Sequence, residues 1–231
     1  MRCHGGKAVR VAIMQPYFFP YAGYFRLFAA VDLFVALDCV QFPRRGWVHR
    51  NRLDDRNGDK QWFTLPLRKA DRDSTRIVDL AFQDDAQSVL RQQARRFPAL
   101  DRLDKGVAGL EQCLFELGES PVDYLCDTLA WQAQVLGQGR PMRRSSELDI
   151  DPELRAQDRI IAIAREVGAT QYVNAPGGRE LYDASGFAKA GLKLHFLSEY
   201  GGRFESMLQR LALEDPVEIA AEITRLTSFE D

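Results

Sequence analysis

The sequence has little of what metal sites and disulfide frameworks require. Among 231 residues there are four cysteines and three histidines, and the cysteines, at positions 3, 39, 113 and 126, form no Cys-x-x-Cys pair. No His or Cys spacing typical of zinc ligands occurs, so no metal site is predicted. Disulfides are not expected, because nothing marks the chain as secreted.

Long apolar segments are also missing. The longest, Phe25–Leu37, is interrupted by Arg26 and Asp32 and is shorter than a helix that crosses a membrane. The first seven residues carry charge and no apolar segment follows them, so no signal peptide is predicted. We therefore expect a cytoplasmic protein without a membrane partner.

The chain has no excess of positive charge. Its 31 basic and 33 acidic residues give a formal net charge of -2, which argues against a protein that binds nucleic-acid duplexes. Arg outnumbers Lys by 25 to 6, so Arg clusters are informative only where aromatic residues and glycines surround them. The 45% of hydrophobic and 28% of charged residues are typical of a globular protein, and the length suits one domain over residues 1–231.

Motifs of the common enzyme classes are absent as well. The chain contains no Gly-x-Ser-x-Gly, no P-loop and no Gly-x-Gly-x-x-Gly, so hydrolase, kinase and dinucleotide-binding functions lack support. Candidate site residues must therefore be found from their positions in the expected fold.

A strand, a loop, a helix and a second strand follow one another near the start of the chain. Val9–Met14 and Leu33–Leu37 are apolar and β-branched, as in buried strands, and Phe25–Val31 has helical spacing. This βαβ arrangement predicts that the two strands are parallel neighbours. The fold class is α/β, with a Rossmann-like parallel-sheet core.

The rest of the chain continues this pattern around a helical middle. Asn57-Gly58 predicts the turn of a β-hairpin, and the helical middle, at about residues 86–140, is expected to be an insertion into the core. Further elements are expected as a strand at Ile77–Phe82, a helix at Asp158–Val167, a strand at Gln171–Val173, a helix at Phe187–Ala190, a strand at Lys193–Leu197 and a helix at Glu218–Leu226.

Ligands of parallel sheets bind beyond the carboxyl ends of the strands, and two irregular loops begin there. In the first loop, Gln15 ends a strand, tyrosines offer hydroxyl groups, and Gly23 opens a helix whose free N–H groups suit an anion. The binding candidates in this loop are Pro16, Tyr17, Tyr21 and Gly23, and Gln15 and Tyr24 are catalytic candidates. The alternative is that these aromatic residues cap the hydrophobic core.

The second loop runs from Asp38 to Arg52 and combines arginines with Gly46 and Trp47. Arginines can clamp phosphate through paired hydrogen bonds while an indole stacks on a base or a sugar. The alternative is a solvated basic loop. Asp38 is a candidate Mg²⁺ ligand or general base, or otherwise a carboxylate that caps a helix or forms an ion pair.

A third candidate is the segment that begins at Asn174. Its glycines, Gly177 and Gly178, allow a ligand to approach the backbone closely, and the Asn174 amide can both donate and accept hydrogen bonds. Most such segments are ordinary turns.

These same segments resemble the WbqC-like family over about residues 10 to 200. The resemblance lies in Ile13-Met14-Gln15-Pro16-Tyr17-Phe18-Phe19-Pro20-Tyr21, Gly23-Tyr24-Phe25, Val31-Asp32, Asp38, Gly46-Trp47, Arg50-Asn51-Arg52, Trp62-Phe63-Thr64-Leu65-Pro66-Leu67, Gln157-Asp158-Arg159-Ile160, Pro176-Gly177-Gly178 and Glu180-Leu181-Tyr182. It implies a bacterial, cytoplasmic protein encoded among surface-polysaccharide genes that make nucleotide-linked amino sugars. Cys39 departs from the family pattern, in which a second acidic residue is expected after Asp38, and this weakens a metal site of two carboxylates.

A looser similarity connects the first 42 residues with nucleotidylyltransferase-superfamily ligases. It consists of the order strand, Pro-containing loop, Gly, helix, strand and then Val40-Gln41-Phe42. Those enzymes adenylate a carboxylate with ATP and transfer it to an amine. Two histidines that contact the phosphates in them correspond to Tyr and Gly here, so the similarity concerns the fold, and ATP with Mg²⁺ stays open as a cofactor.

The leading hypothesis is an enzyme that acylates or aminoacylates the amine of a nucleotide-linked amino sugar. Its partners are then small molecules, the sugar and an acyl or aminoacyl donor; the oligomeric state is not predicted. The rival hypothesis is a non-catalytic binding or assembly protein of the polysaccharide pathway. The proposed catalytic residues are Gln15, Asp38 and Tyr24, and the proposed binding residues are Pro16, Tyr17, Tyr21, Gly23, Gln41, Arg45, Trp47, Arg50, Asn51, Arg52, Trp62, Asn174, Gly177 and Gly178.

One geometric expectation tests this site directly. Gln15 and Asp38 should follow adjacent parallel strands, with their side chains within reach of a shared water molecule.

Overall fold

Five short strands form one parallel sheet in the computed structural model, which describes residues 8–71 and 74–230. Their order across the sheet is β5 (Met142–Arg144), β2 (Leu33–Ala36), β1 (Arg10–Met14), β6 (Gln171–Asn174) and β7 (Lys193–Phe196). Every pair of neighbours is parallel. The sheet grows outward from β1 first in one direction and then in the other, which is the order of a doubly wound, Rossmann-like fold. The predicted α/β class is confirmed.

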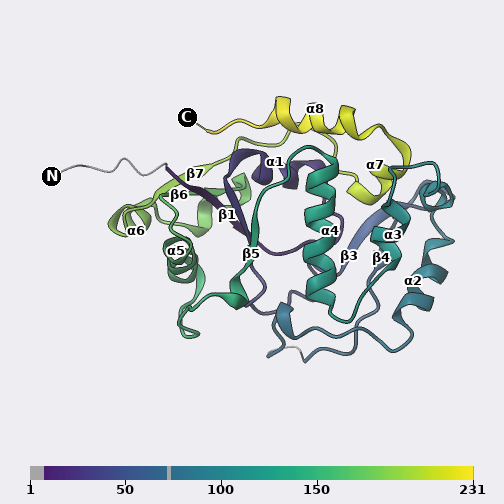
Figure 1. Cartoon of the computed structure of the whole chain (residues 1–231), viewed down its shortest axis with the longest axis horizontal. Helices are drawn as coiled ribbons and strands as arrows, with labels where there is room; N and C mark the ends of the chain where they lie inside the picture. Colours follow the sequence, from purple (N-terminus) through teal and green to yellow (C-terminus); the bar gives the residue numbers. More distant parts are fainter. Residues whose placement is uncertain (1–7, 72–73, 231) are drawn as a thin grey trace.

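Side chains of the sheet alternate between two apolar layers, because successive residues of a strand point to opposite faces. Val11 and Ile13 belong to a cluster with α5 (Ala156–Glu166) and α6 (Ala184–Lys189). Ala12 belongs to a larger cluster with α1 (Ala22–Ala30), which α8 (Pro216–Leu226) covers. Figure 1 shows α1 and α8 along the top of the molecule and α5 and α6 at its left.

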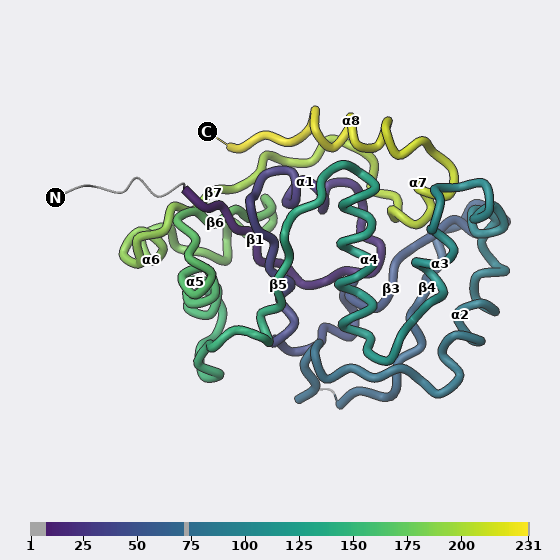
Figure 2. Tube along the Cα trace, viewed as in Figure 1, coloured from purple at the N-terminus to yellow at the C-terminus, as the bar shows by residue number. Residues whose placement is uncertain are grey.

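The remaining elements pack beside the sheet, on the right of Figure 2. An antiparallel hairpin is formed by β3 and β4, and α4 crosses the front of the molecule in this view. The large apolar cluster continues from α1 through Phe63, Leu90, Leu114 and Leu125, so the helical middle shares a core with the sheet. These elements are β3 (Arg50–Asp54), β4 (Lys60–Thr64), α2 (Ala86–Ala94), α3 (Leu110–Phe115), α4 (Pro121–Val135) and α7 (Met207–Leu213), with short 3₁₀ turns at Ile77–Asp79, Pro98–Arg102, Ser145–Glu147 and Pro176–Leu181.

Several helices begin at a polar side chain that accepts a hydrogen bond from the first turn. Ser120, Asp183, Ser206 and Asp215 cap α4, α6, α7 and α8 in this way. No side chain caps α1, α2 or α3, and none caps the 11-residue helix α5. Its first N–H groups therefore have no partner within the helix.

The βαβ unit and the hairpin predicted from the sequence are both confirmed. Val11 lies opposite Leu33 in the parallel pair of β1 and β2. In the hairpin turn the Asp55 carboxylate accepts hydrogen bonds from the backbone N–H groups of Asn57 and Asp59, and Gly58 has φ of 84°, which favours glycine.

The strand predicted at Ile77–Phe82 is wrong. Residues Ile77–Asp79 form a 3₁₀ turn, which is closed by the pairing of the Arg76 guanidinium with the Asp79 carboxylate at 2.8 and 2.9 Å. The alternating pattern reflects a buried Ile77 and a single bridge between Phe82 and Leu67 rather than a strand. Two elements were missed, β5 and α7; β5 has only three residues, of which two are arginines.

Among the described residues, no helix combines the length and the apolar character needed to cross a membrane.

Candidate functional site

The first two predicted loops leave the sheet next to each other. Gln15 follows β1 and Asp38 follows β2, and these strands are adjacent and parallel, with Met14 opposite Ala36. Asn174 ends β6, the neighbour of β1 on the other side. Because the strand order reverses between β1 and β6, this edge of the sheet is where ligands of doubly wound folds bind.

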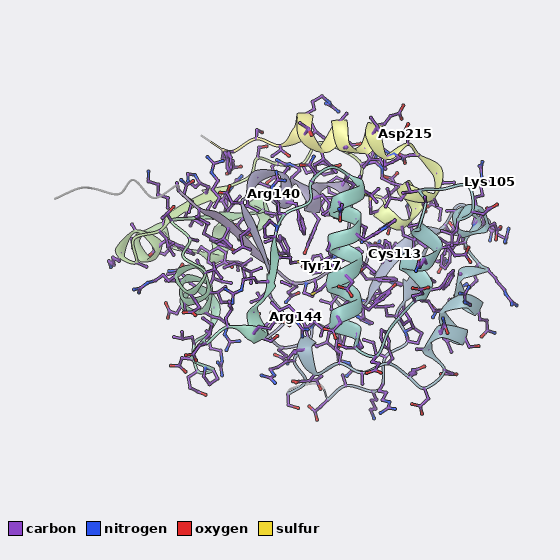
Figure 3. The ribbon with its side chains drawn as sticks, viewed as in Figure 1. Tyr17, Lys105, Cys113, Arg140, Arg144 and Asp215 are labelled. Carbon is purple, nitrogen blue, oxygen red and sulfur yellow. The ribbon has the colours of Figure 1, made fainter. Side chains whose placement is uncertain are left out.

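Asp38 is completely buried and binds four donors from the last residue of β5 and the two residues that follow it. Its Oδ1 accepts from the Ser145 hydroxyl at 2.9 Å and from the Ser146 N–H at 2.8 Å. Its Oδ2 accepts from Arg144 Nε at 2.9 Å and from the Ser146 hydroxyl at 2.7 Å. Arg144, beside the lower end of β5 in Figure 3, also binds Asp123 of α4.

This network decides what Asp38 can do. A carboxylate has about four lone-pair positions, and all four are engaged here. No oxygen position is therefore left for a Mg²⁺ ion or for a substrate proton, and the residues at this point do not fit a magnesium site. We assign Asp38 a positioning role, in which it joins the ends of β2 and β5 to α4.

Tyr24 and Asn51 hold the two predicted loops in place. The Tyr24 hydroxyl donates to the Gln15 carbonyl at 2.7 Å, and burial raises the pKa of Tyr24 well above its ordinary value. The buried Asn51 amide donates to the carbonyls of Phe18 and Phe19 at 3.1 and 2.6 Å. The Phe18 N–H donates to the Trp47 carbonyl at 2.9 Å, so the loops contact each other directly.

The other residues of the first loop pack mainly against aromatic neighbours. Tyr17 lies near the centre of the molecule in Figure 3, with its ring 5.4 Å from that of Tyr24, and Pro16 is buried. Burial raises the pKa of the Tyr17 hydroxyl. Tyr21 stacks on Phe204 at 5.1 Å, and a Cβ at Gly23 would overlap the Tyr21 ring. Ring packing therefore accounts for a glycine at position 23. This agrees with the alternative that the aromatic residues of this loop cap the hydrophobic core.

Four residues of the second loop and the hairpin form what we term the aromatic–arginine platform: Trp47, Arg50, Arg52 and Trp62. The Arg50 and Arg52 guanidiniums lie 4.0 and 4.8 Å from the Trp62 ring centroid, and the two indoles are 5.4 Å apart. Alternation along β3 places both arginines on one face, while Asn51 points to the other. The Trp47 side chain is 40% exposed.

The guanidiniums of this platform carry uncompensated charge. Arg50 Nε donates to the Gly46 carbonyl at 3.3 Å, and within residues 8–71 and 74–230 neither Arg50 nor Arg52 pairs with a carboxylate. Burial, together with Arg50 and Arg44, lowers the pKa of His49 to about 4, so its imidazole is neutral at pH 7. Arg45 is exposed in the turn that precedes Gly46.

A cavity of about 780 Å³ opens at the same edge of the sheet, where β2 and β5 end. It is bounded by the residues after Leu37, by the Ser145–Ser146 pair, by the 3₁₀ turn around Val78 and by the start of α5. Of the residues predicted from the sequence, Gln41 lines it. Its arginines, Arg76, Arg155 and Arg159, were missed, because the Arg-rich composition made isolated arginines uninformative.

The arginines of the cavity differ in their partners. Arg76 is neutralised by Asp79, as described above. Arg159 donates to the carbonyls of Cys39 at 3.3 Å and Pro152 at 2.8 Å. Arg155 donates to the carbonyls of Pro152 and Leu154. Because carbonyl oxygens carry no net charge, Arg155 and Arg159 leave this side of the cavity positive.

The third predicted segment forms a 3₁₀ turn, Pro176–Leu181, after β6. The Asn174 side chain is 4% exposed, and its Oδ1 accepts from the Ala175 N–H at 2.8 Å. A Cβ at Gly178 would overlap the Asn174 amide, whereas a Cβ at Gly177 meets no atom within 4 Å. Gly178 is thus required by packing, and Gly177 leaves room for a ligand.

Among the residues that the structure describes, no cluster of three or more His, Cys, Asp or Glu side chains is arranged to hold a metal ion. Cys39, Cys113 and Cys126 are free thiols, and Cys3 lies outside the described residues.

The Asp38 network should dominate the stability of this edge of the sheet. Asp38→Asn removes the charge that pairs with Arg144, and we expect it to lower the free energy of unfolding by about 3 kcal/mol, as for a broken buried ion pair. Ser146→Ala removes one hydroxyl donor and should cost about 1 kcal/mol. Urea denaturation measures both. Equal stability of the two variants would show that the carboxylate is not the structural link.

The two glycines after β6 provide a matched pair. Gly178→Ala should lower the free energy of unfolding by about 1–3 kcal/mol, because the buried Asn174 amide must move. Gly177→Ala should leave stability unchanged within about 0.5 kcal/mol. Thermal unfolding of both variants is the measurement, and a stable Gly178→Ala protein would contradict the packing described here.

Comparison with known proteins gives a family and one relative. A model of the WbqC-like protein family matches residues 15–206. The uncharacterized protein Rv1507c of Mycobacterium tuberculosis is 26% identical over 196 residues, which cover 84% of each chain. No solved structure matches the chain. The family match spans the first two loops, the hairpin, the cavity and the turn after β6, and the chain therefore belongs to the WbqC-like protein family.

Proposed function

We propose that this protein is an enzyme of surface-polysaccharide precursor synthesis that acylates or aminoacylates the amine of a nucleotide-linked amino sugar. The observation that carries the proposal is the aromatic–arginine platform. Arg50 and Arg52 lie over Trp62 and, in the part of the chain that the structure describes, lack a carboxylate partner; the exposed Trp47 lies beside them. This combination suits a diphosphate with an attached base or sugar.

Stacking on an indole leaves the edge of a guanidinium free. The N–H donors of arginine lie in the plane of the group, so a stacked arginine can still form two parallel hydrogen bonds with a phosphate. In the proposal Arg50 and Arg52 bind the diphosphate, Arg45 adds charge at the rim, and Trp47 stacks on the base.

The first loop is the proposed location of the reacting amine. It is joined to the platform through the Phe18 N–H and the Asn51 amide, and it begins with Gln15 at the carboxyl end of β1. Gln15 is half-buried, and its backbone carbonyl is occupied by Tyr24. In the proposal the Gln15 side chain binds and orients the amine through hydrogen bonds, and Tyr17 and Tyr21 exclude water.

The proposed reaction is an acyl transfer from the donor to the amine of the sugar. The amine nitrogen attacks the acyl carbonyl carbon, and a C–N bond forms. The bond between this carbon and its leaving group breaks, and the leaving group departs with the electron pair. The leaving group is a thiolate for a thioester donor, or AMP for an acyl adenylate made from ATP. The nitrogen releases its proton to solvent.

One observation favours the rival function, a binding protein without catalysis. Asp38 and Tyr24, two of the three predicted catalytic residues, are bound in internal hydrogen bonds. The third, Gln15, is an amide and cannot accept a proton as a general base near neutral pH. A binder would need only the platform and the loops that support it.

Mass spectrometry separates the two functions. Purified protein is incubated with nucleotide-linked amino sugars and either acyl-CoA donors or carboxylic and amino acids with ATP. The proposal expects the sugar nucleotide to gain the mass of an acyl or aminoacyl group. Binding without any mass change across the whole panel would instead support the binding protein.

The phosphate-binding role of Arg50 and Arg52 is tested by substitution with lysine. Each Arg→Lys change keeps the charge but loses the bidentate geometry, and should weaken binding of a nucleoside diphosphate sugar by roughly 1.5–3 kcal/mol, or about ten- to a hundredfold. Isothermal titration calorimetry measures the affinity. The control is Arg56→Lys, in the turn of the same hairpin, where the arginine pairs with Asp101. Unchanged affinity in both platform variants would remove this surface from the site.

A further inference from the structure

The cavity at the ends of β2 and β5 is separate from the platform. One segment of the chain contributes to both. Gln41 lines the cavity, and Trp47, Arg50 and Arg52 of the platform follow Gln41 in the sequence. Trp47, Arg50, Arg52 and Trp62 do not line the cavity. A transfer reaction needs sites for two substrates, and the platform accounts for one of them.

We propose that the cavity binds the acyl donor, an organic anion with an apolar body whose carboxylate or phosphate group is held by Arg155 and Arg159. The name acyl donor rests on the proposed function; the chemistry of the ligand rests on the cavity itself.

The walls of the cavity favour an apolar body. Hydrocarbon side chains form part of the wall beside the polar groups, and they offer a surface on which an apolar group can pack. These side chains are Leu37, Val40, Val78, Leu148, Ile150 and Ile160.

The charge of the cavity favours an anion. Arg155 and Arg159 use only part of their five N–H donors on main-chain carbonyls, so further donors remain for a ligand. Asp151 also lines the cavity, and its Oδ1 accepts from the Glu153 N–H at 2.9 Å. One carboxylate against two arginines leaves a net positive charge.

The size of the cavity favours an activated donor over a free acid. A volume of about 780 Å³ lies in the upper part of the range of small-molecule sites and exceeds what a short carboxylic acid fills. An acyl group attached to a phosphate-bearing carrier would place its chain on the apolar wall and its phosphate near Arg155 and Arg159. We therefore expect acyl thioesters of coenzyme A to bind more tightly than the corresponding free acids.

Cys39 provides a reporter inside the cavity. It is half-buried, and Arg159 Nη1 lies 3.9 Å from its Sγ. Burial raises the pKa of the Cys113 and Cys126 thiols to about 12, so they react slowly with alkylating reagents. The rate of Cys39 alkylation should therefore report whether the cavity is occupied.

The experiment measures iodoacetamide labelling of each cysteine by peptide mass spectrometry on the full chain. Butyrate, octanoate and their coenzyme A thioesters are the probes, and uridine diphosphate tests the alternative ligand. We expect the thioesters to slow Cys39 labelling at lower concentrations than the free acids, and uridine diphosphate to have no effect. Labelling that none of the acyl compounds slows would overturn the inference.

A pair of variants on one helix tests the role of arginine. Arg155→Gln removes a cavity charge at the start of α5, and Arg165→Gln makes the same change in the last turn of that helix, outside the cavity. Half-protection of Cys39 by octanoyl-CoA should require about tenfold more ligand in Arg155→Gln and the wild-type concentration in Arg165→Gln. Equal protection in the two variants would also overturn the inference.

The two proposals fail in different ways. Protection of Cys39 by acyl compounds without any acylated product supports the cavity as a binding site and refutes the enzyme. Protection by uridine diphosphate alone would assign the cavity to the nucleotide and refute the acyl-donor site. Acylated product without protection of Cys39 would support the enzyme and place its donor elsewhere.

Discussion

The buried carboxylate of Asp38 is the interaction on which the edge of the sheet depends. It accepts four hydrogen bonds from Arg144, Ser145 and Ser146. Arg144 also pairs with Asp123 of α4. Breaking such a pair leaves an uncompensated charge in a medium that solvates it poorly, which explains why every acceptor position is filled. The same residues, Ser145 and Ser146, form part of the cavity wall, so the network that stabilises the fold also shapes a candidate binding site.

A second constraint fixes the first loop against the hairpin. Phe19 has φ of 44°, a conformation that costs a non-glycine residue of order 1–3 kcal/mol. Its carbonyl accepts hydrogen bonds from Asn51 and from the Ser206 hydroxyl at 2.8 Å, which hold this conformation. Ala156, which lines the cavity, also has φ of 44°. Strain of this kind persists where the surrounding structure fixes the backbone, and both residues lie at candidate sites.

These constraints hold the loops that carry the two candidate sites, the platform and the cavity. The platform offers guanidiniums that lie over an indole ring, whereas the cavity combines arginine with hydrocarbon side chains. Asp38, Tyr24 and Asn51 each form hydrogen bonds that join these loops to neighbouring elements. In the proposed function the platform would hold the nucleotide-linked substrate and the cavity would hold the acyl donor.

The sequence by itself determined the α/β class, the parallel pair of β1 and β2 and the hairpin, because apolar periodicity and Asn57-Gly58 are local signals. It also identified the loops that follow β1 and β2. Tertiary structure alone decided the partners of each polar residue: the partner of Asp38 is Arg144, which lies more than 100 residues away in the chain. It likewise decided that Arg155 and Arg159 line a cavity while Arg76 is neutralised. The physical reason is that the function of a charged group depends on its burial and its partners, and both arise from contacts distant in the chain.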